Sequence, residues 1–140
     1  MNAPIIVDTS AVISLVSQTD SNHAHAETIG ATVAASGRTL LVPEEVFTET
    51  VNTLGKKTGH DTAAAVGQRL QTSGEFTIME TTPTLRAAAM VRFETQPKGV
   101  SLTDCYVMVF ADAFATKEIF GFDEAFAKNG YCLPDGRKAV

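Results

Sequence analysis

The sequence predicts an α/β protein in three layers, α/β/α, with helices on both faces of a central parallel sheet of four or five strands. Short apolar runs and longer helix-compatible segments alternate along the chain, which is typical of parallel sheets because each parallel connection needs a crossover. The first run, residues 4–7, has three β-branched residues without polar alternation, as expected of a strand covered on both faces. No repeat or linker divides residues 1–140, so we expect a single domain.

Four segments are predicted to be strands because they are short, rich in β-branched or aromatic residues and bounded by turn residues. They are residues 4–7, 39–42, 76–79 and 118–122.

Six segments are predicted to be helices from their length, their apolar spacing and their end signals. They are residues 11–16, 23–35, 43–59, 60–72, 82–95 and 101–116. Pro43 and Pro83 suit a first helical turn, and Gly59 suits a helix stop. The last helix is apolar almost all round, so we expect it to be buried. Ser101 and Asp104 at its start resemble a capping box with an acid in the glutamate position.

The composition is that of a folded chain, with 44% apolar and 19% charged residues. The apolar stretches are too short to cross a bilayer and no leader is evident, so we expect a cytoplasmic protein without membrane contact. The net charge of −5 gives no overall attraction to phosphate, although carboxylates that bind cations would offset it locally. Cys105 and Cys132 lack a metal-binding spacing and are expected to be two reduced, buried thiols.

Four acidic residues meet at one edge of the predicted sheet. Asp8 and Asp123 each follow a strand, Asp104 opens the buried helix, and Glu49 lies near the start of the helix after the second strand. Strand ends and the following helix starts share one edge when the strands are parallel. Carboxylates brought together repel one another unless a cation or bound protons offset the repulsion. A site of oxygen ligands without His or Cys favours magnesium or manganese.

Each acid also has a purely structural interpretation. Asp8 or Thr9 can cap the next helix, and Asp104 at a helix start is favoured by the macrodipole alone. Asp123 can belong to an ordinary turn, and Glu49 lies at the flank of an apolar stripe. For Asp8 the pattern leaves cap and site equally open. For Asp104 the apolar surroundings favour a functional partner, because buried charges need one.

Four motifs together resemble PIN-domain ribonucleases of the VapC type, the toxins of toxin–antitoxin pairs. The motifs are Ile6-Val7-Asp8-Thr9-Ser10, Glu49-Thr50-Val51-Asn52-Thr53-Leu54, Ser101-Leu102-Thr103-Asp104 and Phe122-Asp123-Glu124-Ala125-Phe126. The resemblance implies that the catalytic and metal-binding acids are Asp8, Glu49, Asp104 and Asp123, supported by Thr9, Ser10 and Thr103. It also implies Mg²⁺- or Mn²⁺-dependent cleavage of RNA, a homodimer and a cognate antitoxin protein. We expect an antitoxin helix in an apolar groove along the helices that contain Val12, Leu15 and Val51, with an Arg or Lys among the carboxylates.

Two alternatives within the same family stay open, a housekeeping RNA-processing nuclease and a catalytically inactive PIN-like binding scaffold. Phosphatases of the haloacid-dehalogenase type need a second acid two residues after the first, where Ser10 stands. His23, His25 and His60 are expected to be surface or packing residues, so no histidine is a candidate general base.

Overall fold

The computed structural model describes residues 3–138, which contain a four-stranded parallel sheet in the order β3-β2-β1-β4. The strands are β1 (Ile5–Val7), β2 (Leu40–Pro43), β3 (Phe76–Met79) and β4 (Ile119–Phe120). β1 lies between β2 and β4, and Ile6 is in register with Leu41 on one side and Ile119 on the other. The predicted α/β class and parallel sheet are confirmed.

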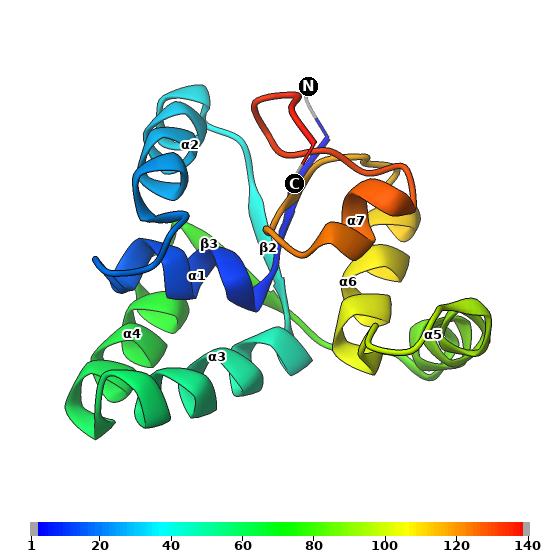
Figure 1. The fold of residues 1–140 in the computed structure, drawn as a ribbon, viewed down its shortest axis with the longest axis horizontal. Coiled ribbons are helices and arrows are strands. Elements are labelled where there is room, and N and C mark those ends of the chain that lie inside the picture. Colours follow the sequence, from blue (N-terminus) through cyan, green and yellow to red (C-terminus); the bar gives the residue numbers. More distant parts are fainter. Residues whose placement is uncertain (1–2, 139–140) are drawn as a thin grey trace.

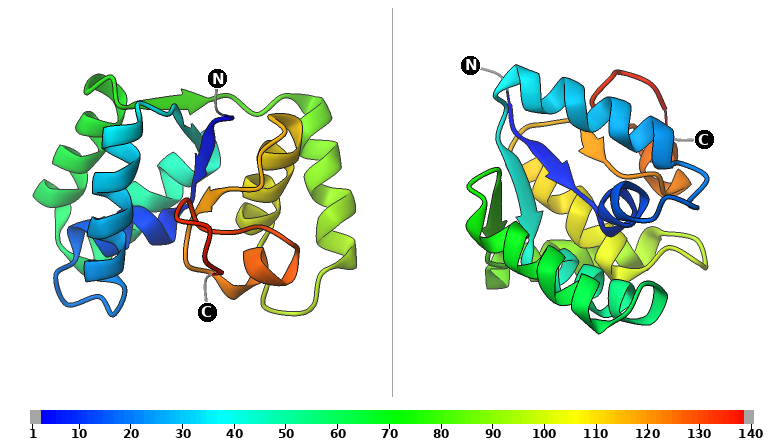
Figure 2. Two further views of the ribbon diagram at one scale, coloured as in Figure 1. Left: turned by 90° about the horizontal axis from the view of Figure 1, so that it is seen from above. Right: turned by 90° about the vertical axis from the view of Figure 1, so that its left-hand side faces the viewer.

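Seven helices accompany the sheet within the described residues. They are α1 (Thr9–Val16), α2 (His23–Ser36), α3 (Glu44–Lys57), α4 (His60–Thr72), α5 (Pro83–Thr95), α6 (Leu102–Ala113) and α7 (Glu124–Lys128). Figures 1 and 2 show α2 on one face of the sheet and α6 on the other, with α5 outside α6. Successive side chains of β1 point to opposite faces of the sheet, because side chains alternate along a strand. Ile5 belongs to the cluster that includes Ile29 of α2, and Ile6 to the cluster that includes Met108 of α6.

The helix after Ser101 is buried and capped as the sequence predicts. Ser101 Oγ accepts a hydrogen bond from the Asp104 N–H, and an Asp104 oxygen accepts one from the Ser101 N–H, both at 3.0 Å. All eight residues from Asp104 to Ala111 are buried. This fixes the start of α6 at the carboxyl edge of the sheet.

Several predicted boundaries are wrong by a few residues. β4 covers two residues and not 118–122, because the Phe122 N–H donates to the Ser10 hydroxyl and takes no part in the sheet. Pro43 is the last residue of β2, with an extended ψ of 144°, and not the first of the helix. α6 ends at Ala113, two residues before the positive φ of Ala115, and not near Thr116.

The short helix α7 is an addition to the predicted elements. It begins directly after Asp123, whose side chain caps it. No helix within residues 3–138 is both long and apolar enough to cross a membrane.

Candidate metal centre

Asp8 stands where β1 ends and α1 begins. Its Oδ2 accepts hydrogen bonds from the Ser10 N–H at 3.2 Å and from the Ser10 hydroxyl at 2.7 Å. Its backbone N–H donates to the Phe120 carbonyl of β4, so the residue is tied to both strands. Asp8 is 4% exposed. Asp8 is therefore a helix cap at the end of a central strand, and its role in a functional site stays a prediction.

Asp104 and Asp123 also cap helices at the same edge. Asp104 Oδ2 accepts from the Ser101 N–H at the start of α6, and Asp104 is 8% exposed. Asp123 Oδ1 accepts from the Ala125 N–H at 2.9 Å at the start of α7. Glu49 lies in the second turn of α3, is half-buried, and forms no hydrogen bond through its side chain to any residue between 3 and 138.

The three aspartates share one arrangement: one carboxylate oxygen caps a helix while the other has no hydrogen bond to any described residue. The second oxygens are Oδ1 of Asp8, Oδ1 of Asp104 and Oδ2 of Asp123. No buried polar side-chain atom of residues 3–138 lacks a partner, so the second oxygens of Asp8 and Asp104 are reached by solvent. Each aspartate is thus held in place by its cap and keeps an oxygen for a ligand.

The pKa values of Asp8 and Asp104 are raised mainly by burial and further by repulsion between the acids. Burial raises the pKa of Asp8 to about 7 against the opposing hydrogen bonds of Ser10, and the charges of Asp104 and Glu49 add to the rise. Burial likewise raises the pKa of Asp104, helped by the charges of Asp123 and Glu49. These couplings connect all four predicted acids, because charges perturb one another strongly only at short range.

The donor set fits a hard divalent cation, although no three acidic, histidine or cysteine side chains between residues 3 and 138 surround a common point closely enough to hold one. The four acids supply carboxylate oxygens and Ser10 supplies a hydroxyl beside them, and hard oxygen ligands are what Mg²⁺ and Mn²⁺ select. Like charges repel, so a spread arrangement of carboxylates is favoured until a cation offsets their charge.

The three predicted supporting residues differ in what they contact. Ser10 hydrogen-bonds Asp8 and also accepts from the Phe122 N–H at 2.8 Å, so it joins the end of β1 to the loop that carries Asp123. Thr9 is buried and contacts Thr50, whose hydroxyl donates to it at 3.4 Å. Thr103 is half-buried at the start of α6 and forms no side-chain hydrogen bond within residues 3–138. Whether they support catalysis stays a prediction.

Gly121 is a residue of the site that sequence reasoning missed. A Cβ on Gly121 would lie 2.6 Å from the Asp8 Cβ and 2.9 Å from a ring carbon of Phe126. Only a glycine lets the chain after β4 pass this close to Asp8. The available signal was a glycine inside the predicted strand 118–122, which often marks a close backbone approach.

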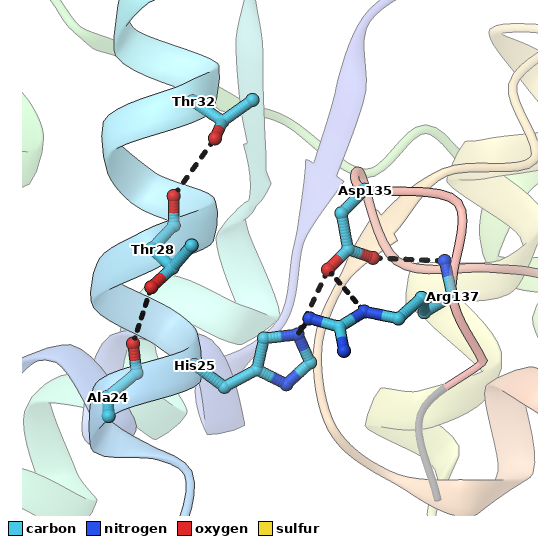
Figure 3. A network of polar contacts seen from close by, with 6 residues as sticks. All are labelled: Ala24, His25, Thr28, Thr32, Asp135 and Arg137. Carbon is cyan, nitrogen blue, oxygen red and sulfur yellow. Dashed lines mark hydrogen bonds and ion pairs between the residues drawn. The ribbon is translucent and has the colours of Figure 1, made fainter.

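The histidines lie at the surface or in structural contacts, as predicted. His23 Nδ1 is 2.7 Å from the Ser14 carbonyl. His25 Nε2 lies 3.0 Å from Asp135 Oδ2 and 3.1 Å from Arg137, which ties α2 to the segment after α7 (Figure 3). His60 is exposed at the start of α4.

The two cysteines are free, as predicted, but only Cys105 is buried; Cys132 is half-buried. Cys132 pairs with Glu118 in an isolated bridge at the margin of the sheet, which leaves its side chain partly open. The prediction of two buried thiols is wrong for Cys132.

The sheet is parallel, and its first strand β1 lies between two other strands. Aspartates cap the helices that follow β1 and β4, and a further one lies at the start of α6. Together these features define an α/β domain of the PIN class. The chain belongs to the PIN domain family, whose model matches residues 5–130. Members of this family are typically nucleases that use divalent metal ions. The predicted membership of the PIN-domain family is therefore confirmed.

Among solved structures, the fold is similar to that of Mycobacterium tuberculosis VapC20, described as a sarcin–ricin loop cleaving toxin. The TM-score is 0.80 at 21% sequence identity, and the match covers 91% of this chain and 96% of that chain. A comparison with curated protein sequences gives no match.

Proposed function

We propose that the protein is a Mg²⁺- or Mn²⁺-dependent endoribonuclease and the toxin of a toxin–antitoxin pair. The observation that carries the enzymatic part is the arrangement of Asp8, Asp104 and Asp123, each anchored through one carboxylate oxygen and open at the other. A purely structural cap needs one oxygen and has no reason to gather three acids and Glu49 at one edge. Membership of a family of nucleases supports the same reaction.

In this proposal Asp8, Glu49, Asp104 and Asp123 hold the metal, and no side chain acts as nucleophile. When bound, a divalent cation supplies Lewis-acid activation of water and of the scissile phosphate. Ser10 fixes the orientation of Asp8 and the distance to the loop of Asp123 through its two hydrogen bonds. Asp8 must lose its proton before it can bind a cation, because a ligand carboxylate must be ionised.

The toxin role is proposed from the shared fold with VapC20, which is itself described as a toxin. A hollow of about 990 Å³ lies between α2 and α4 and is partly lined by Val12 and Leu15 of α1. We assign the helix of a cognate antitoxin to this hollow. None of the four acids lines it, and it extends to Leu40 and Phe76 at the starts of β2 and β3, so the expected position beside the carboxylates is not met. Val51 does not line the hollow. That side chain packs against the cluster of Ile13, Leu54 and Ala63.

A homodimer is part of the proposal, with its contact on α5. Met90, Val91 and Phe93 of α5 are the large apolar side chains most exposed in the described part of the chain, at 43%, 65% and 40%. Sedimentation of the wild-type protein and of a Val91→Glu variant would test this assignment, since the variant is expected to be monomeric.

The central experiment is cleavage of a labelled RNA panel that includes a sarcin–ricin stem-loop, with Mn²⁺, with Mg²⁺ and with excess chelator. We expect cleavage with either metal and none with chelator, and we expect His23→Gln, His25→Gln and His60→Gln to remain active. Equal cleavage in chelator would overturn the metal-dependent mechanism. A harmless phenotype on expression of an active enzyme would overturn the toxin role in favour of RNA processing.

A further inference from the structure

A shallow hollow runs along the exposed side of α3 and includes Glu49, one of the four acids of the candidate metal centre. Its volume is about 610 Å³, and Glu49 is one of its lining residues. From Glu49 it continues past Asn52 to Lys56. The hollow therefore shares Glu49 with the proposed site and extends from there toward the end of α3.

These residues lie in one row on the helix. Glu45, Glu49, Asn52 and Lys56 are separated by four, three and four positions, the spacing of residues on one helical face. At ~1.5 Å rise per residue, Glu49 and Lys56 are about 10 Å apart along the axis. A phosphate one or two nucleotides from the scissile one on the same RNA strand would lie within reach of the long Lys56 side chain.

The charge along the row changes sign from one end to the other. Thr81 engages the glutamates at the acidic end: its N–H donates to Glu44 at 3.1 Å and its hydroxyl donates to Glu45 at 2.6 Å. Beyond Glu49 the lining residues are Asn52, Thr53 and Lys56, which carry hydrogen-bond donors and no further acid. An anion is repelled at the end that carries Glu45 and Glu49 unless a metal ion is bound there. It is attracted at the end that carries Lys56.

Lys56 is free to meet such an anion. Neither Lys56 nor its neighbour Lys57 is among the side chains that form ion pairs within residues 3–138, which are His23, His25, Arg38, Arg69, Arg92, Lys128 and Arg137. Lysines at a helix end are favoured by the macrodipole alone, and that explanation applies to both equally. Only Lys56 lines the hollow.

We infer that Lys56 and Asn52 form a subsite for an RNA backbone phosphate that flanks the scissile bond. The inference rests on the proposed ribonuclease function and adds to it the side on which the substrate strand leaves the metal centre. A chain with a net charge of −5 has no general attraction to RNA, so its affinity must come from local contacts of this kind.

The test compares Lys56→Gln with Lys57→Gln, two variants of equal charge on adjacent positions. With Mn²⁺ and an RNA that the wild type cuts, Lys56→Gln is expected to raise KM about fivefold to tenfold, because one charge-assisted contact is lost, and to leave kcat unchanged. Lys57→Gln is expected to leave both constants unchanged. Thermal melts of the two variants verify that both fold.

A binding measurement keeps this test separate from that of the ribonuclease proposal. In chelator, the slope of log affinity against log salt for a labelled single-stranded RNA should fall by about 0.7 in Lys56→Gln and stay unchanged in Lys57→Gln. Equal slopes and equal KM values in the two variants would overturn the subsite. If the wild type cuts no RNA, the ribonuclease proposal fails and the binding slopes alone decide whether Lys56 contacts phosphate.

Discussion

Replacing Asp8 by asparagine in the metal-free protein isolates the free energy that its buried charge costs the fold. Asparagine keeps an oxygen that can accept both Ser10 hydrogen bonds, so the cap of α1 is retained. The substitution removes a carboxylate whose pKa is raised, chiefly by burial, from 3.8 to about 7. That difference corresponds to about 4 kcal/mol.

The sign follows from proton linkage. The native state holds the Asp8 proton more tightly than the unfolded chain, so the wild type loses stability as the pH rises from about 4 to about 7. Asp8→Asn has no such loss. Its stability relative to wild type should therefore increase by about 3 kcal/mol between pH 5 and pH 8 in chelator.

Urea unfolding at several pH values measures this difference, with Asp61→Asn as the control. Asp61 is an exposed acid in the first turn of α4, and its replacement should give no comparable trend. Excess Mn²⁺ should stabilise the wild type at pH 8 and leave Asp8→Asn unchanged. An Asp8→Asn protein that is less stable than wild type at pH 8 in chelator would refute the reasoning and make Asp8 a structural anion.

Three further outcomes follow from the same edge. Asp104→Asn should lower RNA cleavage by more than the roughly 100-fold that is typical for loss of a metal-supporting residue. Its melting temperature in chelator should be no lower than that of the wild type. A large loss of stability would mean that Asp104 has a structural role. Gly121→Ala should cost about 1–3 kcal/mol in urea unfolding through overpacking against Asp8. Gly55→Ala should not destabilise, because its Cβ would meet the Ala63 Cβ at an ordinary contact distance of 3.9 Å. Mn²⁺ affinity measured by calorimetry should rise with pH through about 7, because the cation competes with the proton of Asp8; a flat profile would contradict this.

The sequence pattern predicted most of the fold because strands and helices here carry strong local signals. Ile5, Ile6 and Val7 form an unbroken β-branched run, and Ser101 and Asp104 provide a local cap, so neither element depends on distant residues. Errors arose where a tertiary contact decides the boundary. β4 is cut short by the bond between Phe122 and Ser10, residues 112 positions apart, which no local pattern encodes.

The same distinction applies to the site. Aspartates at strand ends and helix starts converge in any parallel sheet, so Asp8, Asp104 and Asp123 were accessible to sequence reasoning. In each aspartate one carboxylate oxygen caps a helix and the other has no hydrogen bond within the described residues. This arrangement depends on atomic positions that the sequence pattern does not give. The close passage of Gly121 over Asp8 is likewise a distance between remote segments.

The order of the strands also bears on how the protein is made. β1 is complete at Val7, yet its neighbour β4 is formed by Ile119 and Phe120, near the other end of the described chain. During synthesis one edge of β1 stays unpaired until more than a hundred further residues have been translated and β4 can form. Asp123 is translated after β4. At the roughly 5–20 residues per second of translation, the four acids stay unassembled for several seconds. If the proposed function holds, a nascent chain that still lacks Asp123 would lack one of its metal-binding acids and could not cleave RNA near the ribosome that is making it.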